Sequence, residues 1–404
     1  CLLARACDRL GLVNDADDIV TRALDMRRGL PVDGRYLEAL MLASKTAFAR
    51  GAPDRAVALA VEALDSSADD RELTDERRMK LLINALTHDP HSPQTDERLA
   101  ELSDLIDDSS DELSRPLTAE IHQVRSVTSI NRGDFASALA DATRARDLKL
   151  SFGSHPAHVV PETALIAYCQ RRLGRVSEAI REARQGLADA RGLLHPDHPV
   201  FRDLEAILGN ALFAADHRDD AEPHLARAAE LSGSWEKPSK ASTEALYHLG
   251  ILRDSQGRIE ESIEAHQRAV QHALESSGKN SSDRGLNLAL WGRGLRKDDR
   301  PTEALPHLLE AARILEDWMV DGDLRGFFLR QDLAPCLEAG GRHAEAAREW
   351  QAIARTAAML ERWKPYVNRW LLRAAQAFER AGDDESAKRL RDLVPDPQDE
   401  RNDG

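Results

Sequence analysis

Two short loops carry residue types that bind zinc. Each loop sets two histidines beside an aspartate: His88, Asp89 and His91 in the first, and His195, Asp197 and His198 in the second. Zinc sites take histidine, cysteine and carboxylate ligands, with four protein ligands in a structural site and three in a catalytic one. No further ligand is placed near either loop, and isolated motif matches are weak evidence. We therefore expect no bound metal.

The cysteines and glycines offer no catalytic motif either. Cys169 and Cys336 fall on expected helices, where a small buried apolar side chain is expected. The Gly292–Gly294 stretch lies inside an expected helix and opens no strand–helix unit, so it predicts no phosphate-binding loop. None of the four cysteines has a Cys-x-x-Cys spacing, which fits a reducing compartment: Cys1, Cys7, Cys169 and Cys336. We expect no catalytic residue, no cofactor and no enzymatic activity.

Composition narrows the class of protein. Apolar side chains make up 42% of the 404 residues, and helix formers dominate over β-branched and aromatic residues, which favours an all-α chain. The 55 basic and 70 acidic residues give a net charge of −15, which disfavours nucleic-acid binding. No apolar run approaches the roughly 18–20 residues of a spanning helix, and no leader pattern opens the chain. We expect a cytoplasmic protein with no membrane insertion.

The two ends of the sequence carry their own expectations. The first residue is Cys1, which we interpret as the cut end of a longer chain. A lipid-modified N-terminal cysteine is the alternative, disfavoured because the apolar stretch 2–10 follows with no flexible spacer. Residues 396–404 are polar and charged, and they predict a disordered tail.

One period organises the sequence between these ends. Short turn signals recur 41 or 42 residues apart, apart from a first spacing of 40 and one of 82 that spans two units: Gly11, Gly51, Gly133, Gly174, Asp216, Gly257, Asp299, Gly341 and Gly382. The degenerate unit between them covers 77–110 and has a longer loop from His88 to Thr95. This pattern predicts ten helix pairs over residues 1–395, because a fixed period is typical of a solenoid.

Small residues stand at fixed distances from these turns. Seven residues before each turn the chain has Ala4, Ser44, Ser126, Ala167, Gly209, Gly250, Gly292, Ala334 and Ala375. Five residues after it the chain has Ala16, Ala56, Ala138, Ala179, Ala221, Ser262, Ala304, Ala346 and Ala387. A third column, twelve residues after the turn, is also mostly Ala. Small side chains let two helix axes approach to about 8–10 Å, so we expect helices A and B of each unit to cross here.

Prolines agree with these helix boundaries at most positions. Pro53, Pro223, Pro301 and Pro306 fall near the start of a helix B, where a missing N–H costs little. Pro335 falls inside a helix A, where we expect a kink or an early break.

The small residues around a short turn resemble the tetratricopeptide repeat. The family's Leu-Gly pair is matched by Leu208-Gly209 and Leu249-Gly250, with Trp291-Gly292 in the same place, and its Ala-x-x-x-Phe step by Ala221 with Leu225, Ala304 with Leu308 and Ala346 with Trp350. The period, and the His-Pro pairs at His155, His195 and His198, resemble the longer repeats of kinesin light chains and their bacterial relatives. The unit from 122 to 145 departs, since Arg125 stands where the family has Leu.

This resemblance implies a right-handed α-solenoid of about ten antiparallel helix pairs whose A helices line a concave groove. Projecting that face onto the sequence gives the candidate partner-binding residues Tyr168, Arg171, Arg172, Asn210, Phe213, Tyr247, Arg293 and Arg296. The same projection includes Ile251, Asp254, Lys297 and Gln331. Arginines with aromatics suit an acidic or carboxylate-ended peptide with an apolar anchor. The alternative is that these are ordinary solvated residues of helix A.

The resemblance implies a scaffold that binds a protein or peptide partner in this groove, without catalysis of its own. The alternative is the regulatory or docking region of a larger bacterial signalling protein, such as a serine/threonine kinase, whose catalytic domain lies outside this sequence. Trp235 is a second candidate for contacting a partner, unless it folds back on the solenoid. The last tryptophans, Trp350, Trp363 and Trp370, are expected to cover the end of the core. The sequence does not identify the partner or the oligomeric state.

Overall fold

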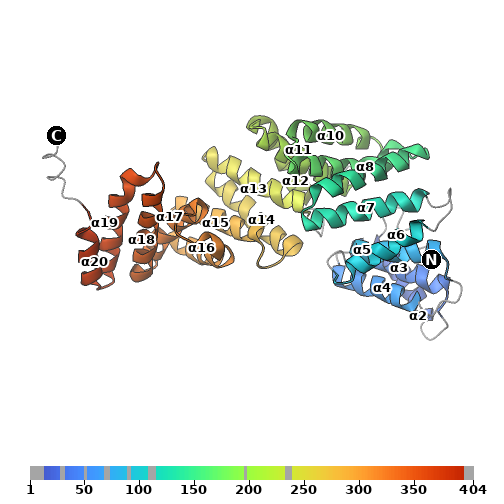
Figure 1. Cartoon of the computed structure of the whole chain (residues 1–404), viewed down its shortest axis with the longest axis horizontal. Coiled ribbons are helices and arrows are strands. Elements are labelled where there is room, and N and C mark those ends of the chain that lie inside the picture. Colours follow the sequence, from blue (N-terminus) through green and yellow to red (C-terminus); the bar gives the residue numbers. More distant parts are fainter. Residues whose placement is uncertain are drawn as a thin grey trace. The chain divides into compact units, whose positions relative to one another are not determined.

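The computed structural model describes residues 13–27, 32–49, 52–67, 73–88, 92–107, 115–194, 198–232 and 239–394. These residues form helices and connecting turns, and no strand occurs among them. The chain divides into two compact units, Cys1–Glu236 (unit 1) and Lys237–Gly404 (unit 2). Figure 1 shows consecutive helices running antiparallel within each unit. The expected all-α solenoid of helix pairs is therefore confirmed.

Within unit 1 the described part of the chain forms α2 and five helix pairs. The helices are α2 (Val13–Arg27), α3 (Gly34–Ala49), α4 (Pro53–Ser66), α5 (Asp75–His88), α6 (Thr95–Asp107), α7 (Arg115–Arg132), α8 (Phe135–Ser151), α9 (Val160–Arg172), α10 (Val176–Ala190), α11 (Pro199–Ala214) and α12 (Arg218–Ser232), with a short 3-10 helix η2 (Pro156–Val159). The pair α5/α6 falls in the stretch predicted as the degenerate unit, with α5 ending at His88 and α6 beginning at Thr95. The stretch 2–10, expected to be the first helix, lies outside the described residues.

Unit 2 contains four helix pairs among its described residues. They are α13 (Lys240–Ser255) with α14 (Ile259–Ser277), α15 (Ser282–Lys297) with α16 (Pro301–Ile314), α17 (Leu324–Ala339) with α18 (His343–Met359), and α19 (Val367–Arg380) with α20 (Asp384–Arg391). Two 3-10 helices, η3 (Glu316–Trp318) and η4 (Lys364–Tyr366), lie between pairs. Together with unit 1 this gives nine complete pairs and α2, in agreement with the ten predicted units. The predicted tail 396–404 and Trp235 lie outside the described residues.

The turn inside each pair has one backbone conformation. Seven of the predicted turn residues are described, and all have a left-handed φ, from 72° to 81° at the glycines and 60° and 58° at Asp216 and Asp299. At every one of these turns the next residue's N–H bonds the carbonyl five residues before it, as in Arg175 to Gln170 at 2.8 Å. This bond closes a Schellman motif, which caps the carboxyl end of a helix. The periodic Gly and Asp therefore mark the points where helix A ends.

Helices A and B of a pair touch at the small residues. A Cβ atom on Gly209 would lie 2.7 Å from the Leu225 side chain, and one on Gly292 would lie 2.6 Å from Leu308. Leu225 and Leu308 both stand nine residues after their turns, so the same crossing is built in both pairs. No room remains there for a side chain larger than hydrogen, which is why the column of small residues recurs.

Where the same column holds serine, the hydroxyl group adds a hydrogen bond. Ser44 donates to the Ala56 carbonyl oxygen at 2.7 Å, and Ser126 donates to that of Ala138 at 2.8 Å. Both acceptors belong to the column five residues after the turn. A small polar residue is tolerated at this buried position because the close approach of the backbones satisfies its hydroxyl.

The proline positions were predicted in part, since Pro223 and Pro306 stand at the sixth residue of α12 and α16, inside these helices and beyond their first turn. Pro53 and Pro301 occupy the first turn of α4 and α16. The break expected at Pro335 is wrong, since α17 continues through it to Ala339. Phe327 and Leu333 before the proline and Leu337 after it all pack into the core of unit 2. Tertiary packing on both sides therefore holds the helix through a residue that is unfavourable on its own.

The C-terminal tryptophans pack against the unit 2 core, as expected. Trp350 and Trp370 are buried in it, and Trp363 lies against it. The Trp370 ring meets Phe327 edge to face, with centroids 5.6 Å apart. These large rings close the last helix pairs with apolar area that a small-residue column could not supply.

Candidate functional site

In unit 1 the predicted residues Tyr168, Arg171 and Arg172 lie close together, beside the ring of Phe135. Phe135 begins α8, and Tyr168 lies in the last turns of α9; their rings meet edge to face with centroids 6.2 Å apart. The Arg172 guanidinium lies 4.5 Å from the Phe135 centroid and 5.9 Å from that of Tyr168. Arg171 lies 5.6 Å from the Tyr168 centroid. We call Phe135, Tyr168, Arg171 and Arg172 the aromatic–arginine cluster.

The turns of two consecutive repeats bring this cluster together. Phe135 follows the turn at Gly133, and Asp134 caps α8 by accepting a hydrogen bond from the Ser137 N–H at 3.1 Å. Arg172 precedes the turn at Gly174. Since α8 and α9 pack against each other, the start of one helix lies beside the end of the next. Phe135 was not among the predicted residues, because it is on a helix B and the projection covered helix A only.

The cluster orients one guanidinium without neutralising it. Tyr168 is only 7% exposed, whereas Arg172 is exposed, so the rings form a base and the cation faces solvent. Arg172 Nη1 donates to the Tyr168 hydroxyl at 3.3 Å. Among the described residues no carboxylate pairs with Arg172. A guanidinium over an aromatic ring keeps N–H groups that can donate to a carboxylate, so the chemistry of this position suits an acidic group.

The two predicted residues on α11, Asn210 and Phe213, were both expected on the exposed face of a groove. Asn210 is 0% exposed, so placing it on the groove surface is wrong. The reason is that α11 packs against α9, its neighbouring helix A, as well as against α10 and α12, and the Asn210 position falls in this packed region. Phe213 is half-buried, and the Arg218 guanidinium lies 5.8 Å from its centroid.

In unit 2 the predicted arginines hold a carboxylate from the protein itself. Arg293 Nε donates to Asp332 Oδ2 at 2.7 Å, and Arg296 donates to Oδ1 through Nε at 3.0 Å and Nη2 at 2.8 Å. The Asp332 side chain is 6% exposed, while each arginine side chain is 32% exposed. The residues lie on α15 and α17, two successive A helices. We call Arg293, Arg296 and Asp332 the arginine–aspartate cluster.

The remaining cation of that helix face is also paired. Lys297 Nζ lies 2.7 Å from both carboxylate oxygens of Asp254 on α13. Three basic residues thus meet two acidic ones, and most of the positive charge predicted for this part of the groove is cancelled. Asp332 lies 39 residues after Arg293, close to one repeat, so searching for opposite charges one period apart would have found it.

Tyr247 lies beside a buried histidine. Its ring meets those of His248 and His266 edge to face, at 5.2 and 6.2 Å. Burial raises the pKa of the Tyr247 phenol, an effect that the Arg293 charge opposes. Burial also lowers the pKa of His266 to about 4, against the opposing effect of the hydrogen bond with Asn287. Tyr247 is therefore a neutral donor, and His266 is uncharged near neutral pH.

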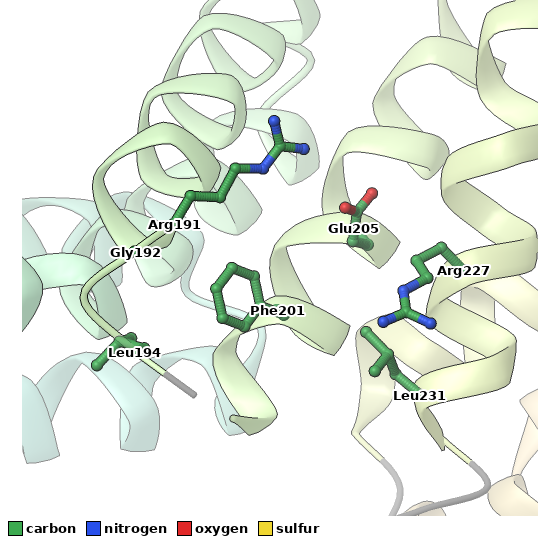
Figure 2. Close-up of a pocket in the computed structure, with 7 residues that line it drawn as sticks. All are labelled: Arg191, Gly192, Leu194, Phe201, Glu205, Arg227 and Leu231. Atoms are coloured by element: carbon green, nitrogen blue, oxygen red, sulfur yellow. The ribbon is translucent and has the colours of Figure 1, made fainter. Parts of the chain in front are cut away.

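A pocket that the sequence did not predict opens at the other end of α10. Its volume is about 250 Å³, and seven residues line it: Arg191, Gly192, Leu194, Phe201, Glu205, Arg227 and Leu231. Figure 2 shows the Phe201 ring in the middle, with Arg191 and Leu194 on one side and Glu205, Arg227 and Leu231 on the other. Glu205 Oε2 lies 2.6 Å from His224 Nδ1. None of these residues belongs to a repeating column.

The metal-ligand types and the cysteines of the described residues can be located in the structure. No group of three or more His, Cys, Asp or Glu in that part of the chain could hold a metal ion. Asp89, His91, His195 and Asp197 lie outside it. Cys169 and Cys336 are buried as expected, and burial raises the pKa of their thiols to about 12 and about 11. Such thiols are poor nucleophiles at neutral pH.

The described helices also bear on membranes. None of them combines the length and apolar character that crossing a bilayer requires.

Comparison with known proteins gives matches in structure but not in sequence. No protein-family model matches the chain, and no curated protein sequence matches it. The Rap protein, in a crystal structure of its complex with Competence and Sporulation Factor, is similar with a TM-score of 0.53 and 15% identity, covering 89% of this chain and 97% of Rap. Apo RapI has a TM-score of 0.51 and 12% identity, covering 91% and 99%.

A third similar structure is the apo form of the quorum sensor NprR from B. thuringiensis. Its TM-score is 0.52 at 11% identity, and the match covers 89% of this chain and 97% of NprR. Identities this low describe the fold alone. Together with the repeated helix pairs, the Schellman turns and the small-residue columns, they show that this chain has the fold of a tetratricopeptide-like solenoid.

Proposed function

We propose that this chain is a protein-interaction scaffold that binds an acidic peptide segment at the aromatic–arginine cluster of unit 1. The observation that carries the proposal is the Arg172 guanidinium. It rests on two rings, faces solvent and has no carboxylate partner among the described residues. An exposed arginine normally loses side-chain entropy on binding, and the rings reduce that loss by holding it in place.

The shape of the cluster also favours an apolar residue in the ligand. Leu173, which directly follows Arg172 at the end of α9, is a large apolar side chain that remains 37% exposed, and Val127 on α7 is exposed to the same extent. An acidic residue on Arg172 and an aliphatic or aromatic residue beside it would use both kinds of surface. Rap, which shares the fold, was crystallised with a bound factor. We propose a related use of the solenoid here.

The arginine–aspartate cluster of unit 2 is the weaker candidate for the same role. Asp332 already occupies the inner edges of both guanidinium groups. A ligand carboxylate would have to displace a buried aspartate or accept only the outer nitrogens. We therefore propose that acid recognition lies in unit 1 and that the unit 2 arginines serve mainly to join α15 to α17.

A selection from a random displayed peptide library tests this function. Binders of the full chain should be enriched in Asp or Glu next to an aliphatic or aromatic residue. Arg172→Glu should lower their affinity by at least about tenfold, since it turns one attractive charge contact into a repulsive one. The matched control is Arg184→Glu on α10, an exposed arginine with the same charge change and with no carboxylate partner in the described chain.

Two results would reject the proposal. One is that selected peptides show no acidic preference; the other is that Arg184→Glu weakens binding as much as Arg172→Glu does. The second result would show a general charge effect instead of a site. Circular dichroism of both variants establishes that the helices remain intact.

A further inference from the structure

The pocket at the end of α10 combines an apolar wall with charges of both signs. Phe201 and Leu231 are buried and form its inner wall, and Leu194 adds to the apolar side. Arg191 and Arg227 supply positive charge, and Glu205 supplies negative charge. Figure 2 shows the side chains of Arg191, Phe201, Glu205 and Arg227 around the pocket. α10 has 15 residues, or about 22 Å of helix, so the pocket is separate from the aromatic–arginine cluster at its start.

The pair α15/α16 has charged side chains at the positions that correspond to Phe201 and Arg227 of this pocket. Phe201 lies 15 residues before its turn, and Arg227 lies 11 residues after it. In the pair α15/α16 the equivalent positions hold Arg284 and Glu310. Arg284 Nη2 donates to Glu310 Oε1 at 2.9 Å, and its side chain is 10% exposed. There the chain closes the site with its own arginine and carboxylate.

In the pair α11/α12 Phe201 stands in the place of Arg284 and Arg227 stands in the place of Glu310, so no ion pair joins these two positions. In the part of the chain that the structure describes, Arg227 pairs with Glu230, one turn further on the same helix, at 2.6 Å. Both side chains are well exposed, so this pair is weak and leaves the pocket open. Arg191 has no charged partner within the described ranges. The pocket therefore has two arginines and no ion pair like the one between Arg284 and Glu310 in the other repeat.

Glu205 excludes a simple anion as the best ligand. His224 occupies one carboxylate oxygen, and Oε1 of Glu205 has no hydrogen-bond partner in the described chain. A ligand carrying only a carboxylate would meet this negative charge, and a cation alone would meet two arginines. A zwitterion satisfies both signs, because its ammonium can face Glu205 while its carboxylate faces the arginines.

We propose that this pocket binds a free α-amino acid with an apolar side chain. The side chain would lie against Phe201, Leu194 and Leu231, the ammonium at Glu205, and the carboxylate at Arg191 and Arg227. The volume is suitable, because a cavity of about 150 Å³ holds a benzene ring and the remaining space fits the two charged groups. An internal residue of a peptide carries neither charge at its backbone, so the site discriminates against it.

Titration of the full chain with L-phenylalanine and L-leucine, followed by ligand-observed NMR and calorimetry, is the direct test. We expect saturable binding with a Kd on the order of 1 mM, as suits a small ligand in an open pocket. Two analogues separate the charged contacts: 3-phenylpropionate lacks the ammonium, and phenethylamine lacks the carboxylate. Each should bind at least about tenfold more weakly than L-phenylalanine.

Variants then assign the contacts to residues. Glu205→Gln should abolish the preference for L-phenylalanine over 3-phenylpropionate, since the amide keeps a hydrogen-bonding group but loses the charge. Arg227→Met should weaken binding of L-phenylalanine about tenfold. The matched control is Arg184→Met on α10, outside the residues that line the pocket, and this variant should bind L-phenylalanine as the unaltered chain does.

Three outcomes overturn the proposal. The first is binding of 3-phenylpropionate as tightly as L-phenylalanine by the unaltered chain. The second is no saturation at concentrations tenfold above the expected Kd. The third is equal weakening by Arg184→Met and Arg227→Met. The first two use the unaltered protein, so a variant that fails to fold cannot obscure the result.

Discussion

Arg172 in unit 1 rests on the rings of Phe135 and Tyr168, whereas Arg293 and Arg296 in unit 2 share the carboxylate of Asp332. Both arrangements fix an arginine near the end of a helix A. An aromatic ring orients the guanidinium and leaves its charge unbalanced, while a carboxylate orients it and cancels the charge. The first arrangement is suited to binding and the second to holding two helices together.

The largest expected effect comes from removing the unit 2 carboxylate. Asp332→Ala leaves Arg293 and Arg296 side by side with no shared acid, so we expect unit 2 to lose about 2 kcal/mol of stability. The value lies below that of a fully buried pair because each arginine is 32% exposed. Denaturant unfolding followed by tryptophan fluorescence measures it well, since five of the six tryptophans belong to unit 2.

The matched control for this variant is Asp254→Ala, whose pair with Lys297 is more exposed. It should cost less than about 1 kcal/mol. Equal losses in the two variants would contradict the assignment of Asp332 as the structural acid. A tighter affinity of Asp332→Ala for the selected acidic peptides would move the proposed binding role toward unit 2.

Acid should destabilise unit 2 through the buried His266. The folded pKa of His266 is about 4, compared with 6.5 for an ordinary histidine, because the ring is buried. Below pH 6.5 the His266 ring becomes protonated in the unfolded chain, whereas in the folded chain it stays neutral until about pH 4. The contribution of His266 to the free energy of unfolding of unit 2 is therefore complete above pH 6.5. It falls as the pH decreases through this window, by about 2 kcal/mol at pH 5.

His266→Leu provides the control for acid sensitivity. The same position, nine residues after the turn, holds Leu225 and Leu308 in two other repeats, where each packs against a glycine. The variant should keep its stability between pH 6.5 and 5 better than the unaltered chain, as measured by denaturant unfolding at each pH. Equal slopes against pH would show that other groups carry the effect.

The smallest expected effect concerns the Tyr168 hydroxyl. Tyr168→Phe keeps the ring under Arg172 and removes only the 3.3 Å hydrogen bond. Affinity for the selected peptides should fall by less than about threefold, because that bond is long. A larger fall would mean that the hydroxyl contacts the ligand directly, which calorimetry on the two proteins would reveal.

The features that the sequence predicted well are those with strict steric requirements. A turn that needs a left-handed residue must hold Gly or a tolerant Asp. A Cβ atom on Gly292 would lie 2.6 Å from the Leu308 side chain, so that position permits no side chain. Such positions repeat with the period and can be read directly. Helix ends, the degenerate pair and the buried cysteines followed from them. The count of helix pairs followed from the same period.

The features that the sequence missed depend on neighbours in space. Asn210 was expected to be exposed because the projection treated helix A alone and ignored its contact with α9. The partner of Arg293 lies 39 residues away, and long side chains can reach several positions at that separation. The pocket beside Phe201 exists because a charge pair found in another repeat is absent, and an absence leaves no motif.

The central claim is that the unit 1 arginine binds the ligand and the unit 2 arginines stabilise the fold. Arg172→Ala and Arg293→Ala should be compared side by side, with peptide affinity and denaturant unfolding measured on each. The account predicts that Arg172→Ala weakens binding at least about fivefold with an unchanged unfolding midpoint, and that Arg293→Ala lowers the midpoint with binding unchanged. Loss of binding in Arg293→Ala alone, with Arg172→Ala unaffected, would contradict it.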